Sequence, residues 1–448
     1  MWGFITVMND VLIPHLKSAF DLTFFQAAFI QSAFFGAFFI ISLFYFLYSV
    51  TKGDLISRIG YKNGILIGLI LCSIGCFLFY PAAHFKQYGF FLSALFVLAS
   101  GVTILQIAAN PYAAILGSEE TASSRLNLAQ GFNSFGTTLA PVIGALLIYK
   151  VFSDGNITVD ALRIPYITFG LLFLLLAVFI KAVSLPEFKN EEEIQRGSGV
   201  LTQRHLVLGM IAIFAYVGGE VSVGSFLINF FGLENIMGME ESEAGKYLSY
   251  YWGGAMIGRF LGAVSMGELS DKLRKYLSMA GLMVASFLVI YLLTSVKNEG
   301  GIFYLSFIPI EDLSLFLIFL LINYSLFIVS GSKASRVLSV FAGMVVVLLL
   351  LVIFLDGYLA FWSAIAIGAF NSILWSNIFT LAIKDLGKQT SQGSSLLVMM
   401  IVGGALVPPL QGLLADGLGV QLSFIVPLIC YLYVLFYGLS GHKVKHNF

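Results

Sequence analysis

The chain has 448 residues, of which 59% are hydrophobic and only 11% are charged, with a mean hydropathy of +0.94. A soluble domain carries about a quarter charged residues, so this composition excludes an ordinary soluble protein. The formal net charge of zero leaves nucleic-acid binding without an electrostatic basis. Because apolar runs of about 20 residues recur along the chain, and that length crosses a bilayer as a helix, we predict an all-α polytopic membrane protein.

Taken in chain order, the apolar runs predict fourteen membrane helices, near 1–20, 24–50, 64–83, 89–116, 126–150, 164–184, 205–232, 244–266, 276–295, 312–330, 337–355, 358–383, 393–414 and 420–439. The longest polar break, 185–204, separates spans six and seven and is predicted to be a cytosolic linker. The predicted domains are an N-terminal six-helix repeat over 1–184 and a C-terminal repeat over 205–448. Twelve spans is the alternative, in which two of the apolar runs near 276–355 do not cross.

The distribution of Lys and Arg predicts the orientation of these spans. With the N-terminus inside, the cytosolic side holds all of the 24 basic residues except Lys17, Lys86, Lys150, Arg163, Lys246 and Lys297. This bias predicts that both termini are cytosolic, as expected for a multi-pass protein of the bacterial inner membrane.

The two halves of the chain resemble each other at two landmarks. KGDLISR (52–58) aligns with MGELSDK (266–272), and NPYAAIL (110–116) aligns with NIFTLAI (377–383). The two offsets, 214 and 267, differ by 53 residues, which is room for two helices and their loops. We therefore predict two parallel six-helix repeats, with an extra helical hairpin inserted near 276–330.

Two acidic residues lie in the middle of predicted spans, Asp10 in span 1 and Glu220 in span 7. Neither has a basic residue three or four positions away. An intramembrane carboxylate is costly and marks a functional site by default, so we predict that both couple an ion to transport. The alternative is a protonated acid that bonds a backbone carbonyl between helices.

Amides and aromatic side chains recur in the predicted spans at matching places in the two repeats. Amides both donate and accept hydrogen bonds and aromatic rings offer flat apolar faces, so this combination suits a polar small molecule that carries several hydroxyls. The predicted substrate-binding residues are Asn9, Gln106, Asn110, Gln130, Asn133, Asn229, Trp252, Asn371, Trp375 and Asn377. For each aromatic, packing against lipid or helices is an equally good explanation.

Several long segments are specific enough to be compared with a known family. Five lie in the first half: MNDVLIPHL (8–16), FQAAFIQSAF (25–34), GYKNGILIGL (60–69), ILQIAANPYAAILG (104–117) and SRLNLAQGFNSFG (124–136). These segments resemble the fucose–galactose–glucose:proton symporters of the major facilitator superfamily. Three resemble the glucose/galactose branch: YVGGEVSVGSFLINF (216–230), FNSILWSNIFTLAIKDLG (370–387) and QGSSLLVMMIVGGALVPPLQG (392–412). The resemblance covers nearly the whole chain except the hairpin near 276–330.

This resemblance implies the major facilitator fold and particular roles for a few residues. In the fucose permease of the family, an Asp of the NDxLxP motif is tied to proton coupling, and that position is Asp10 here. The Glu that precedes AANP in that permease is Gln106 here, which hydrogen-bonds but cannot titrate. Amides implicated in sugar binding fall on Gln130 and Asn133, and Glu220 is shared with the glucose-type members.

The segment GDLISRIG (53–60) resembles the loop 2–3 signature of the superfamily. The resemblance implies a charged cytosolic turn that latches the outward-facing state, with Asp54, Arg58 and Arg259 as the gating residues. A solvated loop is the alternative.

From these patterns we expect a cation-coupled hexose importer that works by alternating access. The coupling ion is expected to be a proton, with sodium as the alternative, and no other cofactor or metal is expected. The sequence has no nucleophile elbow, no P-loop and no His–carboxylate pair at metal spacing, so we expect no enzyme activity. The expected partners are a small sugar and the bilayer, and the expected state is a monomer. The alternative is a proton-coupled drug or metabolite exporter.

Overall fold

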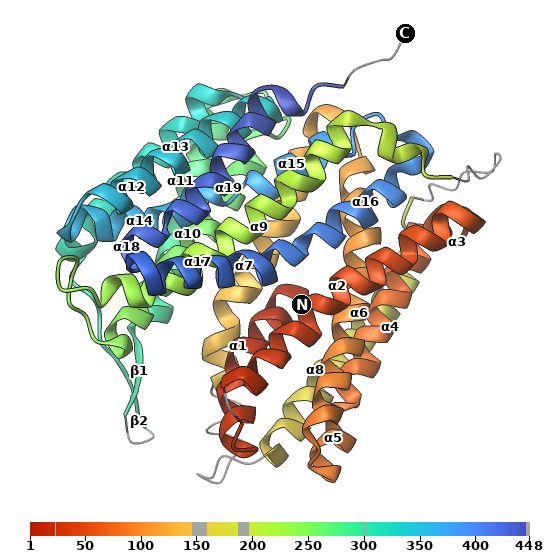
Figure 1. The fold of residues 1–448 in the computed structure, drawn as a ribbon. Coiled ribbons are helices and arrows are strands. Elements are labelled where there is room, and N and C mark those ends of the chain that lie inside the picture. The colour runs from red at the N-terminus through yellow and green to blue at the C-terminus, as the bar shows by residue number, and fades with distance from the viewer. Residues whose placement is uncertain (23, 146–158, 187–196, 300–301, 445–448) are drawn as a thin grey trace. The chain divides into compact units, whose positions relative to one another are not determined.

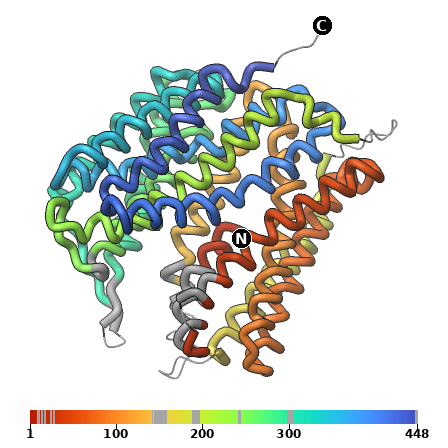
Figure 2. Tube along the Cα trace, viewed as in Figure 1, coloured from red at the N-terminus to blue at the C-terminus, as the bar shows by residue number. Residues whose placement is uncertain are grey.

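The computed structural model describes residues 1–22, 24–145, 159–186, 197–299 and 302–444 (Figure 1), and Figure 2 draws in grey the residues whose placement is uncertain. Almost all of the regular structure is helical, as predicted. The one exception in the described chain is an antiparallel hairpin, β1 (Val296–Glu299) and β2 (Ile302–Leu305), which the all-helical prediction missed. The described chain divides into two compact units, of which unit 1 contains 1–116, 139–203 and 383–402, and unit 2 contains 117–138, 204–382 and 403–448.

Unit 1 is built from helices of the first part of the chain and one helix from far along the sequence (Figure 1). They are α1 (Trp2–Ala19), α2 (Phe24–Lys52), α3 (Leu55–Ile59), α4 (Tyr61–Phe77), α5 (Phe79–Phe85), α6 (Tyr88–Ile115), α8 (Arg163–Ala182) and α16 (Thr390–Met399). The helix α7 (Ala122–Ala145) starts in unit 2 and ends in unit 1. The short helical turns of unit 1 are Val159–Leu162, Gly199–Thr202, Gly387–Gln389 and Met400–Val402.

Unit 2 holds the remaining helices and the hairpin. The helices are α9 (Arg204–Phe231), α10 (Glu241–Ser265), α11 (Lys272–Ser295), α12 (Ser314–Ser330), α13 (Ala334–Phe354), α14 (Gly357–Asn371), α15 (Leu374–Ala382), α17 (Gly403–Leu418), α18 (Val420–Ser423) and α19 (Ile425–Phe436). Short turns follow at Glu119–Thr121, Ile310–Leu313 and Tyr437–Gly441.

Eleven helical segments of the described chain are long and apolar enough to cross a membrane. The other three predicted spans, near 1–20, 126–150 and 244–266, fall on α1, α7 and α10, which have 18, 24 and 25 residues. The amides of α7 and the arginine of α10 reduce the apolar character of those two helices. All fourteen predicted segments are therefore mainly helical in the part of the chain that the structure describes, with a break at 372–373 between α14 and α15.

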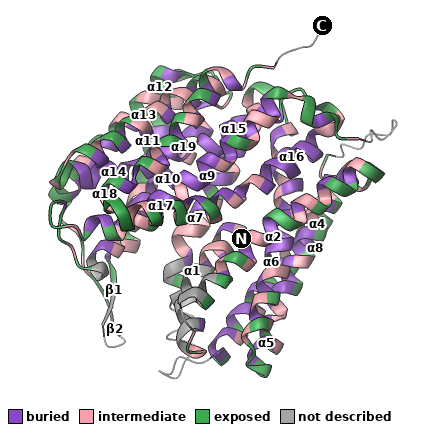
Figure 3. Ribbon diagram, in the orientation of Figure 1, coloured by how far each residue is buried: buried purple, intermediate pink, exposed green. Residues whose placement is uncertain are grey.

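In unit 1, α4 packs against both α6 and α8. The hydroxyl of Ser73 donates a hydrogen bond of 2.8 Å to the Gly170 carbonyl across the α4–α8 contact. At the start of α4, the Lys62 ammonium donates to the Val183 carbonyl at 2.7 Å, which supplies a cation to the end of α8. The helix α16 packs against α2 and α6, and all of its residues are buried (Figure 3).

In unit 2, α10 and α14 approach each other closely. A Cβ built on Gly258 would lie 2.6 Å from the Ala369 carbonyl oxygen, and one built on Gly368 would lie 2.0 Å from the Tyr251 carbonyl oxygen. Side chains at these positions would therefore push the two backbones apart. Because Arg259 follows Gly258 directly, this contact brings its side chain to the end of α14.

Candidate functional site

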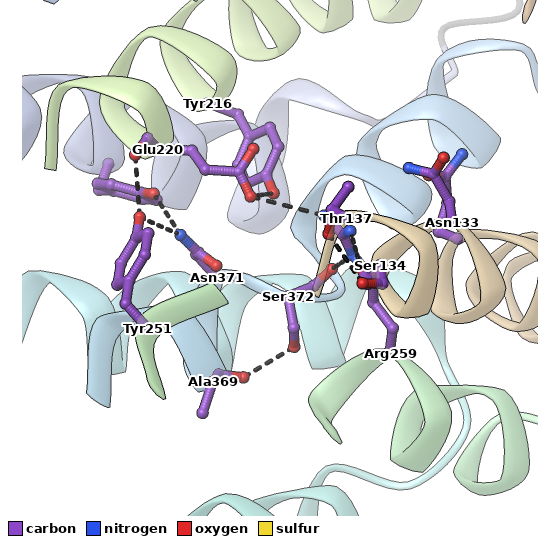
Figure 4. A network of polar contacts seen from close by, with 12 residues as sticks. Asn133, Ser134, Thr137, Tyr216, Glu220, Tyr251, Arg259, Ala369, Asn371 and Ser372 are labelled. Atoms are coloured by element: carbon purple, nitrogen blue, oxygen red, sulfur yellow. Dashed lines mark hydrogen bonds and ion pairs between the residues drawn. The ribbon is translucent and has the colours of Figure 1, made fainter. Parts of the chain in front are cut away.

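The predicted acid Glu220 lies on α9, and its partner on the same helix face is Tyr216, one turn earlier. The Tyr216 hydroxyl donates a hydrogen bond of 2.7 Å to Glu220 Oε1 (Figure 4). Positions four residues apart are neighbours on a helix surface, so this contact follows from the sequence spacing. The carboxylate side chain is 12% exposed.

The charge that faces Glu220 comes from α10. One nitrogen of the Arg259 guanidinium lies 3.5 Å from Glu220 Oε1, and the arginine side chain is 11% exposed. Its Nε donates to the Ser372 carbonyl at 3.0 Å, and another nitrogen donates to the Ser134 hydroxyl of α7. Since Ser372 lies directly after α14, where helix carbonyls lack helical partners, the arginine satisfies one of them. The guanidinium therefore joins α7, α9 and the end of α14 through its forked donors.

Arg259, which the resemblance suggested as a gating residue, is here the partner of an acid on α9. Sequence spacing gave Glu220 no basic neighbour, whereas the structure supplies one from a residue 39 positions later. The gating interpretation missed this pairing because the two residues are brought together only by the packing of α9 and α10.

A second group of polar side chains lies beside this ion pair. The Tyr251 hydroxyl donates to the Glu220 carbonyl at 2.9 Å, and Asn371 Nδ2 donates to the hydroxyls of Tyr251 and Tyr431 at 3.1 and 3.2 Å (Figure 4). Asn371 is fully buried, and its Oδ1 has no hydrogen-bond partner among the described residues. A buried amide oxygen without a partner is costly, so it is suited to accept a bond from a polar ligand.

The predicted amides of α7 lie next to the arginine contact. Asn133 Nδ2 donates to Gln130 Oε1 at 3.4 Å, one helical turn away, and Ser134 directly follows Asn133. The sequence spacing predicted that Gln130 and Asn133 share one face of this helix, and their hydrogen bond agrees with it, while Arg259 contacts the adjacent Ser134 (Figure 4).

The remaining predicted residues of unit 2 have different surroundings. Trp252 is half-buried, and its ring meets Tyr251 edge-on at 5.0 Å between centroids. The ring of Trp375 is buried and stacks on Phe379, so this neighbour occupies one of its faces. Asn377 is fully buried, and neither of its amide atoms has a hydrogen-bond partner among the described side chains and backbone.

Asn229 is not brought to this group of residues. It is exposed near the end of α9, nine positions beyond Glu220, which corresponds to about 13 Å along a helix axis. Asn229 shares with the other predicted residues only its residue type and its place in an apolar span, and the length of α9 separates it from Glu220.

In unit 1, Gln106 and Asn110 lie one turn apart on α6, and Asn110 is buried whereas Gln106 is half-buried. Asn9 and Asp10 lie within α1, but their side chains fall outside the described residues. The structure therefore leaves the predictions for Asn9 and Asp10 untested.

The predicted gating turn also lies in unit 1. Asp54 is buried, caps α3 by accepting a hydrogen bond of 3.0 Å from the Ile56 amide, and accepts another from the Tyr45 hydroxyl. Burial is the main cause that raises the pKa of the Asp54 carboxyl above its ordinary value of 3.8. Arg58 is exposed and donates to the Lys52 carbonyl. A simple solvated loop does not describe Asp54, although it does describe the Arg58 side chain.

Four residues of the unit 2 network were not predicted: Ser134, Tyr251, Ser372 and Tyr431. Ser134 and Ser372 lie inside segments that carry the family resemblance, directly beside predicted amides, and that adjacency was the available signal. Tyr251 and Tyr431 gave no such signal, since a tyrosine in an apolar span is most simply interpreted as a packing residue.

A model of the Major Facilitator Superfamily matches residues 2–345 of the chain. The chain belongs to this superfamily. It is 43% identical to a protein of Brucella abortus named glucose/galactose transporter, over 99% of this chain and 92% of that protein. It is also 28% identical to a protein of Escherichia coli named L-fucose-proton symporter, over 100% of this chain and 92% of that protein.

Solved structures agree with this membership of the superfamily. The chain matches the crystal structure of a superfamily transporter, FucP, in the outward conformation, with a TM-score of 0.75 and 29% identity over 99% of this chain and 96% of that chain. Superfamily members of this kind are sugar transporters and not enzymes. Among the described residues, no group of three His, Cys, Asp or Glu side chains could hold a metal ion.

Proposed function

We propose that this chain is a cation-coupled symporter that imports a hexose, such as glucose, galactose or fucose, by alternating access. A proton is the coupling ion in the proposal, and sodium is the alternative. The observation that carries the proposal is the likeness to a glucose/galactose transporter, which extends over 99% of the chain and so includes every helix with a predicted site residue. The likeness to an L-fucose-proton symporter supports coupling to protons.

The polar atoms of unit 2 support sugar binding. Asn371 Oδ1 and both amide atoms of Asn377 are buried and have no hydrogen-bond partner in the described chain. An amide both donates and accepts, as a sugar hydroxyl does, so these side chains match the chemistry of a hexose. We assign sugar binding to them together with Gln130 and Asn133, and to Gln106 and Asn110 in unit 1.

Asp10 is the proposed coupling acid. A bare carboxylate is costly to carry through an occluded state, and protonation removes that cost. In the proposed cycle Asp10 takes a proton from outside, the sugar binds, and the loaded carrier opens inward. Gating is assigned to Asp54 and Arg58, which lie at the turn between α2 and α4.

The number of membrane crossings and the inserted hairpin are part of the same proposal. In unit 1, α4 packs against α6 and α8, and in unit 2, α13 packs against α14 and α19. The helix α13 then corresponds to α4, and α11, the β1–β2 hairpin and α12 are left without a counterpart, as an inserted hairpin would be. We propose fourteen crossings with both termini cytosolic, in a monomer of the bacterial inner membrane.

Uptake into proteoliposomes tests the function. With a pH gradient, the wild-type chain is expected to accumulate radiolabelled hexose, and a sodium gradient applied alone is expected to drive no accumulation. The variant Asp10→Asn should lose accumulation while retaining sugar exchange between the two sides. If Asp10→Asn accumulates sugar like the wild type, Asp10 is not the coupling acid.

A drug or metabolite exporter is the competing function. Such a protein would move a lipophilic cation in preference to a hexose. The same liposomes loaded with a labelled lipophilic cation decide between the two functions, because hexose transport without cation transport excludes the exporter.

A further inference from the structure

We infer that Glu220 and Arg259 form a fixed and internally neutral ion pair, in which Glu220 positions the arginine and does not carry the transported proton. The inference rests on the proposed function of cation-coupled sugar transport. It departs from the expectation that both intramembrane acids couple an ion, and leaves that role to Asp10 alone.

The first observation is that the charge of Glu220 already has its counter-ion. The guanidinium lies 3.5 Å from Oε1, and Tyr216 donates to the same oxygen at 2.7 Å. Among the described residues, Arg259 is the charged group paired with this acid, the Tyr216 hydroxyl contacts its carboxylate, and the Tyr251 hydroxyl contacts its backbone carbonyl. A carboxylate that is neutralised by an arginine needs no proton to remain in the membrane.

The second observation is that the arginine is held by partners other than Glu220. The Ser372 carbonyl accepts from Nε at 3.0 Å, and the Ser134 hydroxyl accepts from another guanidinium nitrogen. The backbone of α10 is fixed against α14 at Gly258, next to Arg259. The counter-ion is therefore a built part of unit 2, because two of its guanidinium contacts and the packing of its helix do not depend on Glu220.

The third observation is that the arginine contacts α7 next to predicted sugar-binding residues. Its bond to Ser134 lies on α7, directly beside Asn133 and one turn from Gln130. Glu220 is the partner that ties this guanidinium to α9, and together with Ser372 it holds the arginine against the α7 segment that carries these predicted sugar-binding amides. Glu220 is thus a positioning residue for sugar binding.

The experiment compares two single variants, Glu220→Gln and Arg259→Gln, with the double variant that carries both changes. Each single variant leaves one buried charge without its partner, whereas the double variant leaves none. The matched control is the exposed pair Asp271 and Arg274, with 3.4 Å between charged atoms, changed to Asn and Gln. Each protein is reconstituted, and hexose accumulation, hexose counterflow and the ratio of protons to sugar are measured.

The single variants are expected to lose about tenfold or more in both accumulation and counterflow, because the unpaired charge disturbs the site itself. The double variant is expected to regain accumulation to within about threefold of the wild type, with an unchanged ratio of protons to sugar. The control pair should match the wild type in all three measurements.

The opposite pattern overturns the inference. If Glu220 carries the proton, Glu220→Gln and the double variant will both keep counterflow and lose gradient-driven accumulation. A double variant that does not fold also counts against the inference, since two amides should replace a pair that is neutral as a unit. Failure of the proposed function is seen separately, because then the wild type and the control pair would themselves not accumulate hexose.

Discussion

The close contact between α10 and α14 makes Gly258→Ala a direct test of how the site is assembled. The new Cβ would lie 2.1 Å from Ser372 Oγ and 2.6 Å from the Ala369 carbonyl oxygen. The hydroxyl can rotate away, but the backbone oxygen cannot. Ordinary contact starts at 3.4 Å, so the two helices must separate by 3.4 minus 2.6, or about 0.8 Å.

That separation also acts on the ion pair. The bond from Arg259 Nε to the Ser372 carbonyl is 3.0 Å, and about 0.8 Å more takes it beyond hydrogen-bonding distance. Overpacking costs about 1–3 kcal/mol, and the lost bond to a charged donor adds about 1 kcal/mol or more. The better helix propensity of alanine returns about 1 kcal/mol. The expected net loss is about 1–3 kcal/mol in the free energy of unfolding, together with weaker hexose uptake.

Thermal unfolding in detergent and uptake in proteoliposomes measure these two effects. The control is Gly281→Ala on α11, because no atom lies within 4 Å of a Cβ built there. That substitution should be neutral or stabilising by up to about 1 kcal/mol, with normal uptake. If Gly258→Ala unfolds at the same temperature as Gly281→Ala and transports equally well, then close packing at Gly258 does not position Arg259.

Two further predictions concern the gating turn and the tyrosine network. Burial raises the pKa of Asp54 above 3.8, so the folded state holds the proton of this carboxyl more tightly than the unfolded state does. The wild type should therefore gain stability relative to Asp54→Asn as the pH falls from 7, through the raised pKa, towards 3.8. Unfolding temperatures of both proteins across this range check the sign, and a gap that stays constant or widens in favour of Asp54→Asn contradicts it. Tyr251→Phe removes the hydroxyl that links Glu220 to Asn371, so it should cost about 1 kcal/mol and raise the KM for hexose. Tyr250→Phe loses only a bond of 3.2 Å to Thr294, so it should cost a similar amount without changing KM, and equal KM values for both variants would argue against a role of Tyr251 at the site.

The sequence predicted the positions of the helices well, since each predicted span is mainly helical in the part that the structure describes. The reason is local, because a bilayer requires about 20 apolar residues at each crossing whatever the neighbouring helices are. The hairpin β1–β2 was missed because four-residue strands between two long helices produce little periodic signal.

The candidate site was predicted in its residue types but not in its pairings. Glu220 and the amides of α7 were identified because buried polar groups stand out against an apolar background. Asn229 was included for the same reason, yet the structure places it on the exposed end of α9. Residue type identifies polar side chains within a span, and it does not show which of them share a face or a depth.

The sequence by itself determined that this chain is a helical membrane protein, where its spans lie and which few acids and amides are costly to bury. Only the tertiary structure decided that the charge of Glu220 is balanced by an arginine from the next helix, and that this arginine also holds a serine 125 positions away in the chain. The physical reason is that the ability of a segment to cross the bilayer depends on the residues within that segment. A contact between charged atoms depends instead on how closely two backbones approach, and here Gly258 and Gly368 set that distance.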